Sequence, residues 1–123
     1  MALVPLAAKG NFVHVYDFRV KPGRGDDFIT LFNAFDYSDG NPFHKSEAQA
    51  KDGVLCRDVD DPDHFWLLGE WKDIEVHKQI RKIAEGIHPE FVTLVEGGKF
   101  VPKYGEIVSA TPQEVLDRAT AVR

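Results

Sequence analysis

Two side chains near the middle of the chain, Trp71 and His77, could act together on an aromatic molecule. Trp71 ends an aromatic run that begins at His64, and His77 follows it in a stretch with helical periodicity. An indole can stack on a flat ring and donate its N–H, and an imidazole can remove and return a phenolic proton. Both residues also have structural interpretations. Trp71 could anchor the following helix to a sheet. His77 could face solvent beside Lys78, and for His77 we favour this structural interpretation because surface histidines are frequent.

His14 and Tyr16 form a second candidate pair. Strand side chains alternate, so these two residues share one face of the strand predicted over residues 12–21. If that face turns toward the helices, both side chains would line the same cavity as Trp71 and could orient a hydroxyl or keto group. If it turns toward a partner sheet, they are interface residues. The alternation does not decide between these two arrangements.

Metal and nucleotide chemistry are not expected. The spacings of His64, His77 and His88 form no HxH, HxxxH or HExxH pair, so no metal site is predicted. No histidine or acid stands at a motif spacing from Cys56, which favours a buried structural thiol. The only adjacent glycine pair, Gly97-Gly98, has the position of a helix end, and no phosphate-binding loop is present.

The composition is that of an ordinary folded protein. The 123 residues are 43% hydrophobic and 28% charged, which predicts a single domain. The net charge is −5 without a dense basic cluster, so nucleic acid is not an expected partner. The apolar start lacks a cationic region and is too short to span a membrane, so we expect an extended arm. The lone Cys56 agrees with a cytoplasmic protein.

The elements that must position these residues follow from periodicity and turn signals. In order, we expect strand 12–21, helix 26–35, strand 53–58, strand 64–72, helix 73–87, a short helix after residue 89, strand 99–108 and a last helix from residue 111. Residues 43–51 are left open as a loop or a short helix. This order predicts an α+β fold with a ferredoxin-like β-α-β-β-α-β core and an antiparallel four-stranded sheet. Residues 1–10 are the arm, 11–108 the domain, and 109–123 a C-terminal helical extension.

Three local expectations accompany this scheme. Asp26 or Asp27 should cap the first helix, and Thr111 with Glu114 should form a capping box for the last one. Gly86 and His88-Pro89 should weaken or break the second helix.

The predicted sheet carries apolar residues on more than one face. Two helices on one side cannot cover all of them, so a second sheet is needed and we expect a homodimer. The residues behind this expectation are Val13, Val15, Phe65, Leu67 and Phe100.

In this arrangement the sequence resembles the antibiotic biosynthesis monooxygenase family of the dimeric α/β-barrel superfamily. The resemblance covers about residues 11–108. Its motifs are Val20-Lys-Pro-Gly23, the Phe28 stripe of the first helix, Asp52-Gly53-Val54-Leu55, the turn Asp61-Pro62-Asp63-His64-Phe65, and Gly69-Glu70-Trp71-Lys72-Asp73. Family members include oxygenases that need neither metal nor flavin and act on polycyclic phenols or quinols, while others degrade haem.

The resemblance implies a homodimeric, cofactor-independent monooxygenase that acts on a small aromatic substrate with dioxygen as co-substrate. Trp71 matches the family's aromatic residue beside the substrate cavity, and some relatives place a Tyr or His on the helix of His77. Haem-degrading relatives carry an Asn near the position of Tyr16, so haem is the lesser alternative as a cofactor. The catalytic candidates are Trp71, His77 and His14; the substrate-binding candidates are Tyr16, Phe32, Phe35, Phe91 and Arg81.

Two other functions remain open on the same scaffold. One is a non-catalytic protein that binds a small ligand. The other is an isomerase or cyclase that uses the same His and Tyr residues for proton transfer without oxygen.

Overall fold

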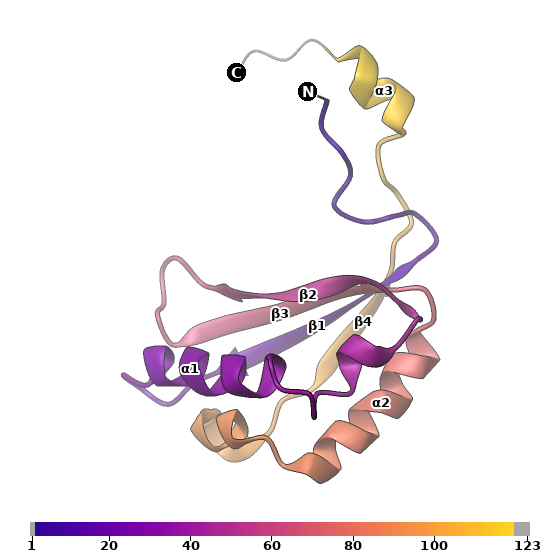
Figure 1. The fold of residues 1–123 in the computed structure, drawn as a ribbon. Coiled ribbons are helices and arrows are strands. Elements are labelled where there is room, and N and C mark those ends of the chain that lie inside the picture. The colour runs from indigo at the N-terminus through magenta and orange to yellow at the C-terminus, as the bar shows by residue number, and fades with distance from the viewer. Residues whose placement is uncertain (1, 120–123) are drawn as a thin grey trace.

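The computed structural model describes residues 2–119, which form a four-stranded sheet covered by helices on one face (Figure 1). All pairings are antiparallel, and the strand order is β2-β3-β1-β4. The strands are β1 (Phe12–Arg19), β2 (Gln49–Arg57), β3 (His64–Trp71) and β4 (Pro102–Glu106). The predicted α+β, ferredoxin-like order of elements is therefore confirmed.

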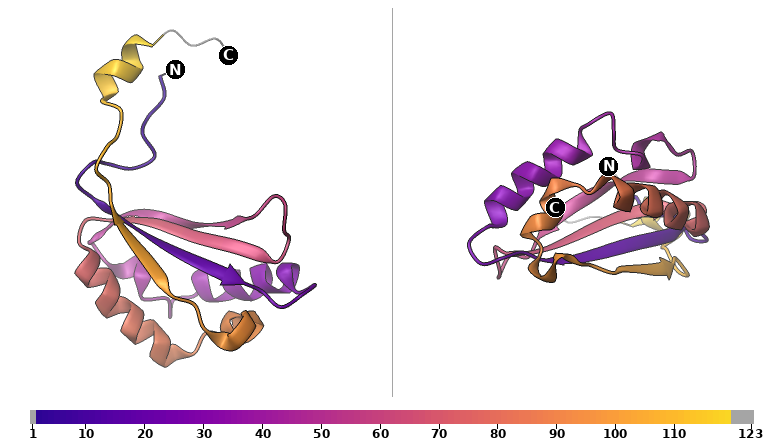
Figure 2. Two further views of the ribbon diagram at one scale, coloured as in Figure 1. Left: turned by 180° about the vertical axis from the view of Figure 1, so that it is seen from behind. Right: turned by 90° about the horizontal axis from the view of Figure 1, so that it is seen from below.

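Two long helices and two short 3-10 segments form the layer below the sheet. Figure 2 shows from two further directions that this layer covers a single face. The helices are α1 (Gly25–Asp36) and α2 (Ile74–Ile87), and the 3-10 segments of this layer are η2 (Glu90–Leu94) and η3 (Glu96–Gly98). A further 3-10 turn, η1 (Phe43–Lys45), precedes β2 in the region that the sequence left open.

The central strand β1 turns its aromatic face toward the helices. His14, Tyr16 and Phe18 are buried, and the ring of Phe18 packs against that of Phe28 of α1 with centroids 5.3 Å apart. The face of His14 and Tyr16, which alternation alone could not assign, is thus the inner one. The rest of the core consists of Val20, Phe28, Phe32, Phe65, Phe91, Leu94 and Val95.

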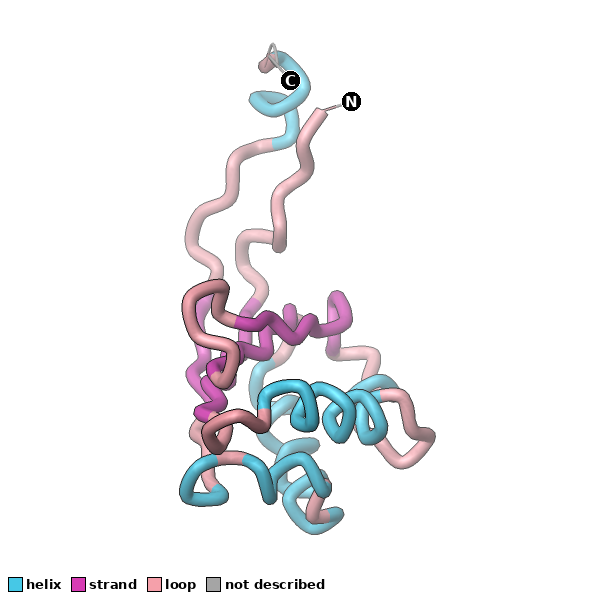
Figure 3. Tube along the Cα trace, turned by 90° about the vertical axis from the view of Figure 1, so that its left-hand side faces the viewer, coloured by secondary structure: helices cyan, strands magenta, loops and turns pink. Residues whose placement is uncertain are grey.

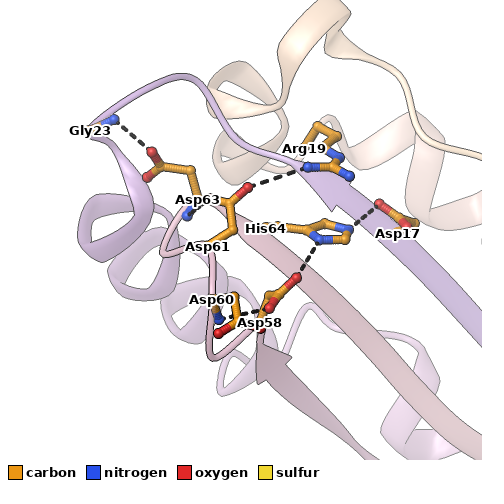
Figure 4. A network of polar contacts seen from close by, with 8 residues as sticks. All are labelled: Asp17, Arg19, Gly23, Asp58, Asp60, Asp61, Asp63 and His64. Atoms are coloured by element: carbon orange, nitrogen blue, oxygen red, sulfur yellow. Dashed lines mark hydrogen bonds and ion pairs between the residues drawn. The ribbon is translucent and has the colours of Figure 1, made fainter.

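The start of α1 is held by the turn between β2 and β3. Neither Asp26 nor Asp27 caps the helix, so that prediction is wrong. Instead, the carboxylate of Asp63 accepts a hydrogen bond from the backbone N–H of Gly23 at 3.0 Å (Figure 4). It accepts a second one from the backbone N–H of Gly25, also at 3.0 Å. These donors would otherwise lack partners at the helix start, so Asp63, which lies in a turn distant in sequence, caps the N-terminus of α1.

The same turn is tied to β1 on the outer face of the sheet. His64 lies between two carboxylates, with Nδ1 3.1 Å from Asp58 and Nε2 2.9 Å from Asp17 (Figure 4). Arg19 adds an ion pair to Asp61 at 3.4 Å. Both ring nitrogens of His64 are engaged, so this histidine stabilises the turn and is not free to act as a base.

Helix α2 has nearly the predicted range. Asp73 caps it by accepting from the backbone N–H of Glu75 at 3.0 Å, and the helix continues through Gly86. A single exposed glycine lowers helix stability without ending the helix, so of the two predicted breaking points only His88-Pro89 ends it. The helix ends at His88, which adopts the left-handed conformation with φ 54°.

The outer face of the sheet is apolar, although its members differ from those expected. Three of the residues expected to need a second sheet, Phe65, Leu67 and Phe100, pack instead against the core on the helix side. The strand registers place four large apolar side chains on the outer face instead. They are Val13, Val15, Trp66 and Leu68.

Residues before β1 and after β4 run side by side away from the sheet (Figures 1 and 3). Backbone N–H of Gly10 donates to Ile107 at 2.9 Å, and the amide of Gln113 donates to the Leu3 carbonyl at 2.8 Å. The projection ends in α3 (Gln113–Arg118), which has no side-chain cap, so the predicted capping box at Thr111 is wrong. The predicted C-terminal extension also included residues 120–123, which lie outside the described residues.

Candidate functional site

A cavity of about 1110 Å³ lies between the sheet and its helices. A space of this size can hold a polycyclic molecule of drug size. All eight site residues proposed from the sequence line it: His14, Tyr16, Phe32, Phe35, Trp71, His77, Arg81 and Phe91.

Trp71 determines the orientation of the His14 ring and which of its nitrogens carries the proton. The fully buried indole donates from Nε1 to Nδ1 of His14 at 2.9 Å. An indole N–H can only donate, so Nδ1 carries no proton and the neutral imidazole carries its proton on Nε2. Burial lowers the pKa of His14 to about 4, which keeps the ring neutral at pH 7. His14 therefore offers an N–H donor at Nε2 and has no free nitrogen with which to act as a base.

The backbone opposite His14 is a glycine for a steric reason. Gly69 pairs with His14 across the sheet, and a Cβ at this position would lie 2.6 Å from Cε1 of the imidazole. Any side chain here would displace the ring. Sequence analysis did not single out Gly69 for this role, although a glycine inside an aromatic strand is a signal for a close approach.

His77 is completely buried, so the favoured solvent-facing interpretation is wrong. Its Nε2 lies 3.2 Å from the hydroxyl of Tyr16, and its Nδ1 lies 3.2 Å from the hydroxyl of Tyr104. Burial, followed by the charges of His14 and Arg81, lowers the pKa of His77 to about 3. The neutral ring donates to one tyrosine and accepts from the other. Tyr104 was not found from the sequence.

The two histidines form one stacked pair. The ring centroids of His14 and His77 are 4.3 Å apart, with an interplanar angle of 19°. A proton on either ring would place charge against its buried neighbour, which adds to the cost of desolvation. Both rings therefore act as neutral hydrogen-bonding groups at pH 7.

Tyr16 and Arg81 complete the polar part of the wall. Burial raises the pKa of Tyr16 well above its usual value, so its hydroxyl stays protonated. The guanidinium of Arg81 lies 5.6 Å from the centroid of the Tyr16 ring. It donates to the carbonyl of Phe100 at 2.9 Å and to Glu85 at 2.6 Å. These bonds hold a positive charge at the cavity wall, which also carries the charged residues Asp36, Asp52, Glu85 and Lys99.

Much of the remaining wall is aromatic, beside polar and aliphatic residues that include Asn33, Asn41 and Leu67. Phe32 and Phe35 of α1 pack against Phe91 of η2, with ring centroids 5.2 and 5.8 Å from that of Phe91. The ring centroid of Phe43 of η1 lies 5.4 Å from that of His77. Phe43 was not predicted as a site residue, because the sequence around it shows no clear periodicity. Flat side chains on several sides favour a flat ligand.

Within residues 2–119, no three His, Cys, Asp or Glu side chains are gathered as metal ligands. Nor does any helix in the described part of the chain have the length and apolar character needed to cross a membrane.

Comparison with known proteins identifies the fold. No protein-family model matches the sequence, and no curated protein does. Solved structures do match. A conserved protein from Methanosarcina mazei Go1 is 18% identical, with a TM-score of 0.61 over 78% of this chain and 91% of that one. A candidate antibiotic biosynthesis monooxygenase from Bordetella bronchiseptica is 20% identical, with a TM-score of 0.60 over 82% of this chain and all of the other.

A third match bears a name that describes its chemistry. SnoaB, a cofactor-independent oxygenase from Streptomyces nogalater, is 17% identical, with a TM-score of 0.54 over 84% of this chain and 95% of that protein. The chain therefore has the fold of the antibiotic biosynthesis monooxygenases, as the sequence resemblance implied. At these identities the likeness defines the fold and not the substrate.

Proposed function

We propose that the protein is a cofactor-independent monooxygenase that acts on a small planar phenol or quinol. The observation that carries this proposal is the hydrogen bond from Trp71 to His14, which fixes a neutral imidazole, with its N–H at Nε2, in the wall of the cavity. A donor held in this way can stabilise the oxygen anion of an ionised phenol. The name of the structural neighbour SnoaB supports the same chemistry.

The substrate, rather than the protein, supplies the electrons. Loss of the hydroxyl proton makes the ring electron-rich, and the anion then transfers an electron to dioxygen. One oxygen atom is bonded to a ring carbon, and the other leaves as water with two hydrogens from the substrate. The protein excludes water, orients the ring between Trp71 and the phenylalanines, and places His14 and Arg81 near the developing charge.

A homodimer is part of this proposal. Within residues 2–119 no helix lies over the outer face of the sheet, which carries the half-buried side chains of Val13, Val15, Trp66 and Leu68. A second copy with the same face would bury both surfaces. The sheet would then be stiffened on both sides, which holds β1 and β3 in place behind the cavity. A cytoplasmic location belongs to the same proposal.

One observation favours a second candidate, a protein that binds an aromatic ligand without converting it. The two histidines at the cavity have pKa values lowered to about 4 and about 3, and the pKa of Tyr16 is raised. None of these groups is tuned toward neutral pH, where a general base is most effective.

Oxygen consumption separates the two functions. The purified protein is mixed with 1-naphthol, anthrone and 1,4-dihydroxynaphthalene in an oxygen electrode, and uncatalysed oxidation is subtracted. The oxygenase predicts turnover with at least one compound and loss of turnover in Trp71→Phe. Turnover should be unchanged in the matched control Trp66→Phe, whose side chain lies on the outer face of the sheet and does not line the cavity. Binding of the compounds, seen as ultraviolet difference spectra without oxygen uptake, would instead establish the ligand-binding protein.

A further inference from the structure

Tyr104 stands on the far side of His77 from the cavity. It belongs to the edge strand β4, is half-buried, and is not part of the cavity wall, whereas Tyr16 is. The ammonium group of Lys78 lies 5.2 Å from the centroid of the Tyr104 ring. Tyr16, His77 and Tyr104 therefore form a continuous hydrogen-bonded row from the cavity to the edge of the sheet.

The neutral state of His77 gives this row two equivalent arrangements. In the first, the Tyr16 hydroxyl donates to Nε2, and Nδ1–H donates to the oxygen of Tyr104. In the second, the Tyr104 hydroxyl donates to Nδ1, and Nε2–H donates to the oxygen of Tyr16. The 3.2 Å distances on both sides of the ring suit either arrangement. Conversion between them moves a proton along the row without a charged imidazole.

His14 cannot provide an alternative route. Its Nδ1 is occupied by the indole N–H of Trp71, and its Nε2 already carries a proton. Arg81 is a permanent cation and cannot accept a proton. A proton that leaves a phenol bound beside His14 can pass instead to the Tyr16 hydroxyl, which is connected through His77 to Tyr104 at the edge of the sheet.

We propose that Tyr16, His77 and Tyr104 form a proton relay between the hydroxyl of a bound aromatic substrate and solvent. The inference rests on the proposed function for its substrate. The substrate O–H bond breaks and a new O–H bond forms at Tyr16. The original Tyr16 proton passes to Nε2 of His77, the Nδ1 proton passes to Tyr104, and the Tyr104 proton passes to water.

The second arrangement then assists the next stage of the reaction. Tyr16 now carries the former substrate proton and can donate a hydrogen bond to the substrate anion. When the row returns to its first arrangement, one proton moves from solvent into the cavity. Reduced oxygen needs a proton to leave as water, so export and return balance over one turnover.

Tyr104→Phe is the direct test, because it removes one hydroxyl and keeps the ring under Lys78. With 1-naphthol as substrate, we expect kcat to fall about ten-fold or more while KM stays unchanged, since proton-transfer groups contribute at least this much to rate. The wild-type kcat should also decrease at least about two-fold in heavy water. Thr30→Val also removes one hydroxyl, from an exposed side chain that does not line the cavity, and should leave kcat unchanged. An unchanged kcat in Tyr104→Phe would overturn the relay.

A second measurement does not depend on turnover. Nitrogen-15 NMR of the imidazole reports which ring nitrogen carries the proton. In the wild type, both nitrogens of His77 should show intermediate, averaged shifts, and Tyr104→Phe should move them toward a single tautomer. Identical His77 shifts in the two proteins would disprove the hydrogen-bonded row. If the wild type consumes no oxygen, the proposed function fails, and this NMR comparison still decides whether the row exists.

Discussion

The stacked pair of His14 and His77 predicts a steep loss of stability in mild acid. In the folded protein their pKa values are lowered to about 4 and about 3, whereas an unfolded histidine titrates near about 6.5. Between these values the unfolded chain binds up to two more protons than the folded one, so stability rises with pH. The contribution is fully present above about pH 6.5 and is lost as the pH falls toward the folded pKa values.

The size of the effect follows from the same shifts. Each histidine adds about 1.4 kcal/mol per pH unit within the window, so the pair gives a slope of about 2.7 kcal/mol per unit. From pH 7.5 to pH 4.5 the loss is on the order of 5 kcal/mol. This approaches the whole stability of a typical small domain.

Urea unfolding followed by tryptophan fluorescence measures this slope, because Trp71 contacts His14 directly. His77→Gln keeps a donor and an acceptor but cannot titrate, so we expect its slope to be about half that of the wild type. His14→Gln should behave in the same way. The control is His88→Asn, since asparagine tolerates the left-handed conformation of this exposed position.

Other groups also titrate in this pH range, but they do not affect the difference in slope between the wild type and the two histidine variants. The pKa of Asp58 is lowered by hydrogen bonds from Asp60 and His64, and that of Asp36 is raised by burial. These contributions are common to the wild type and both variants, so they cancel in the difference between slopes. Equal slopes in the wild type and His77→Gln would refute the argument that the buried pair excludes protons.

Two further predictions concern the strand β3. Gly69→Ala should displace the His14 ring, weaken 1-naphthol binding at least about ten-fold in a spectroscopic titration, and lower the free energy of unfolding by about 1–3 kcal/mol. The control Gly86→Ala, at an exposed helix position with open space around it, should raise the free energy of unfolding by up to about 1 kcal/mol. Equal effects at both sites would contradict the steric argument. Leu68→Glu should convert the dimer into a monomer in sedimentation experiments, and an unchanged near-ultraviolet circular dichroism spectrum should show that this monomer is folded. A wild-type protein that sediments as a monomer at micromolar concentration would exclude the proposed interface.

The order of elements could be predicted because it depends on local signals. Alternating aromatic residues in β1, the Pro22-Gly23 stop and the acidic turn before His64 each act over a few residues. Their order along the chain predicted the ferredoxin-like arrangement, and the resemblance to a known family agreed with it. Both led to the correct sheet and to the residues around the cavity.

What could not be predicted depends on contacts between distant segments. His77 was assigned to solvent from its place on a charged helix, but two tyrosines from β1 and β4 approach it only in the folded sheet. Likewise, the α1 cap comes from Asp63, 38 residues after Gly25. Helix and strand patterns carry no information about such partners, so the relay and the cap required the structure.

The contact between Gly69 and His14 also sets a rule for recognising related proteins. Because a methyl group at one position collides with the imidazole at the other, substitutions at the two positions should occur in pairs across neighbouring strands. Homologous sequences that keep both glycine and histidine would share this cavity wall even where overall identity is low. Those that replace the glycine should carry a smaller residue opposite, and with it a different ligand.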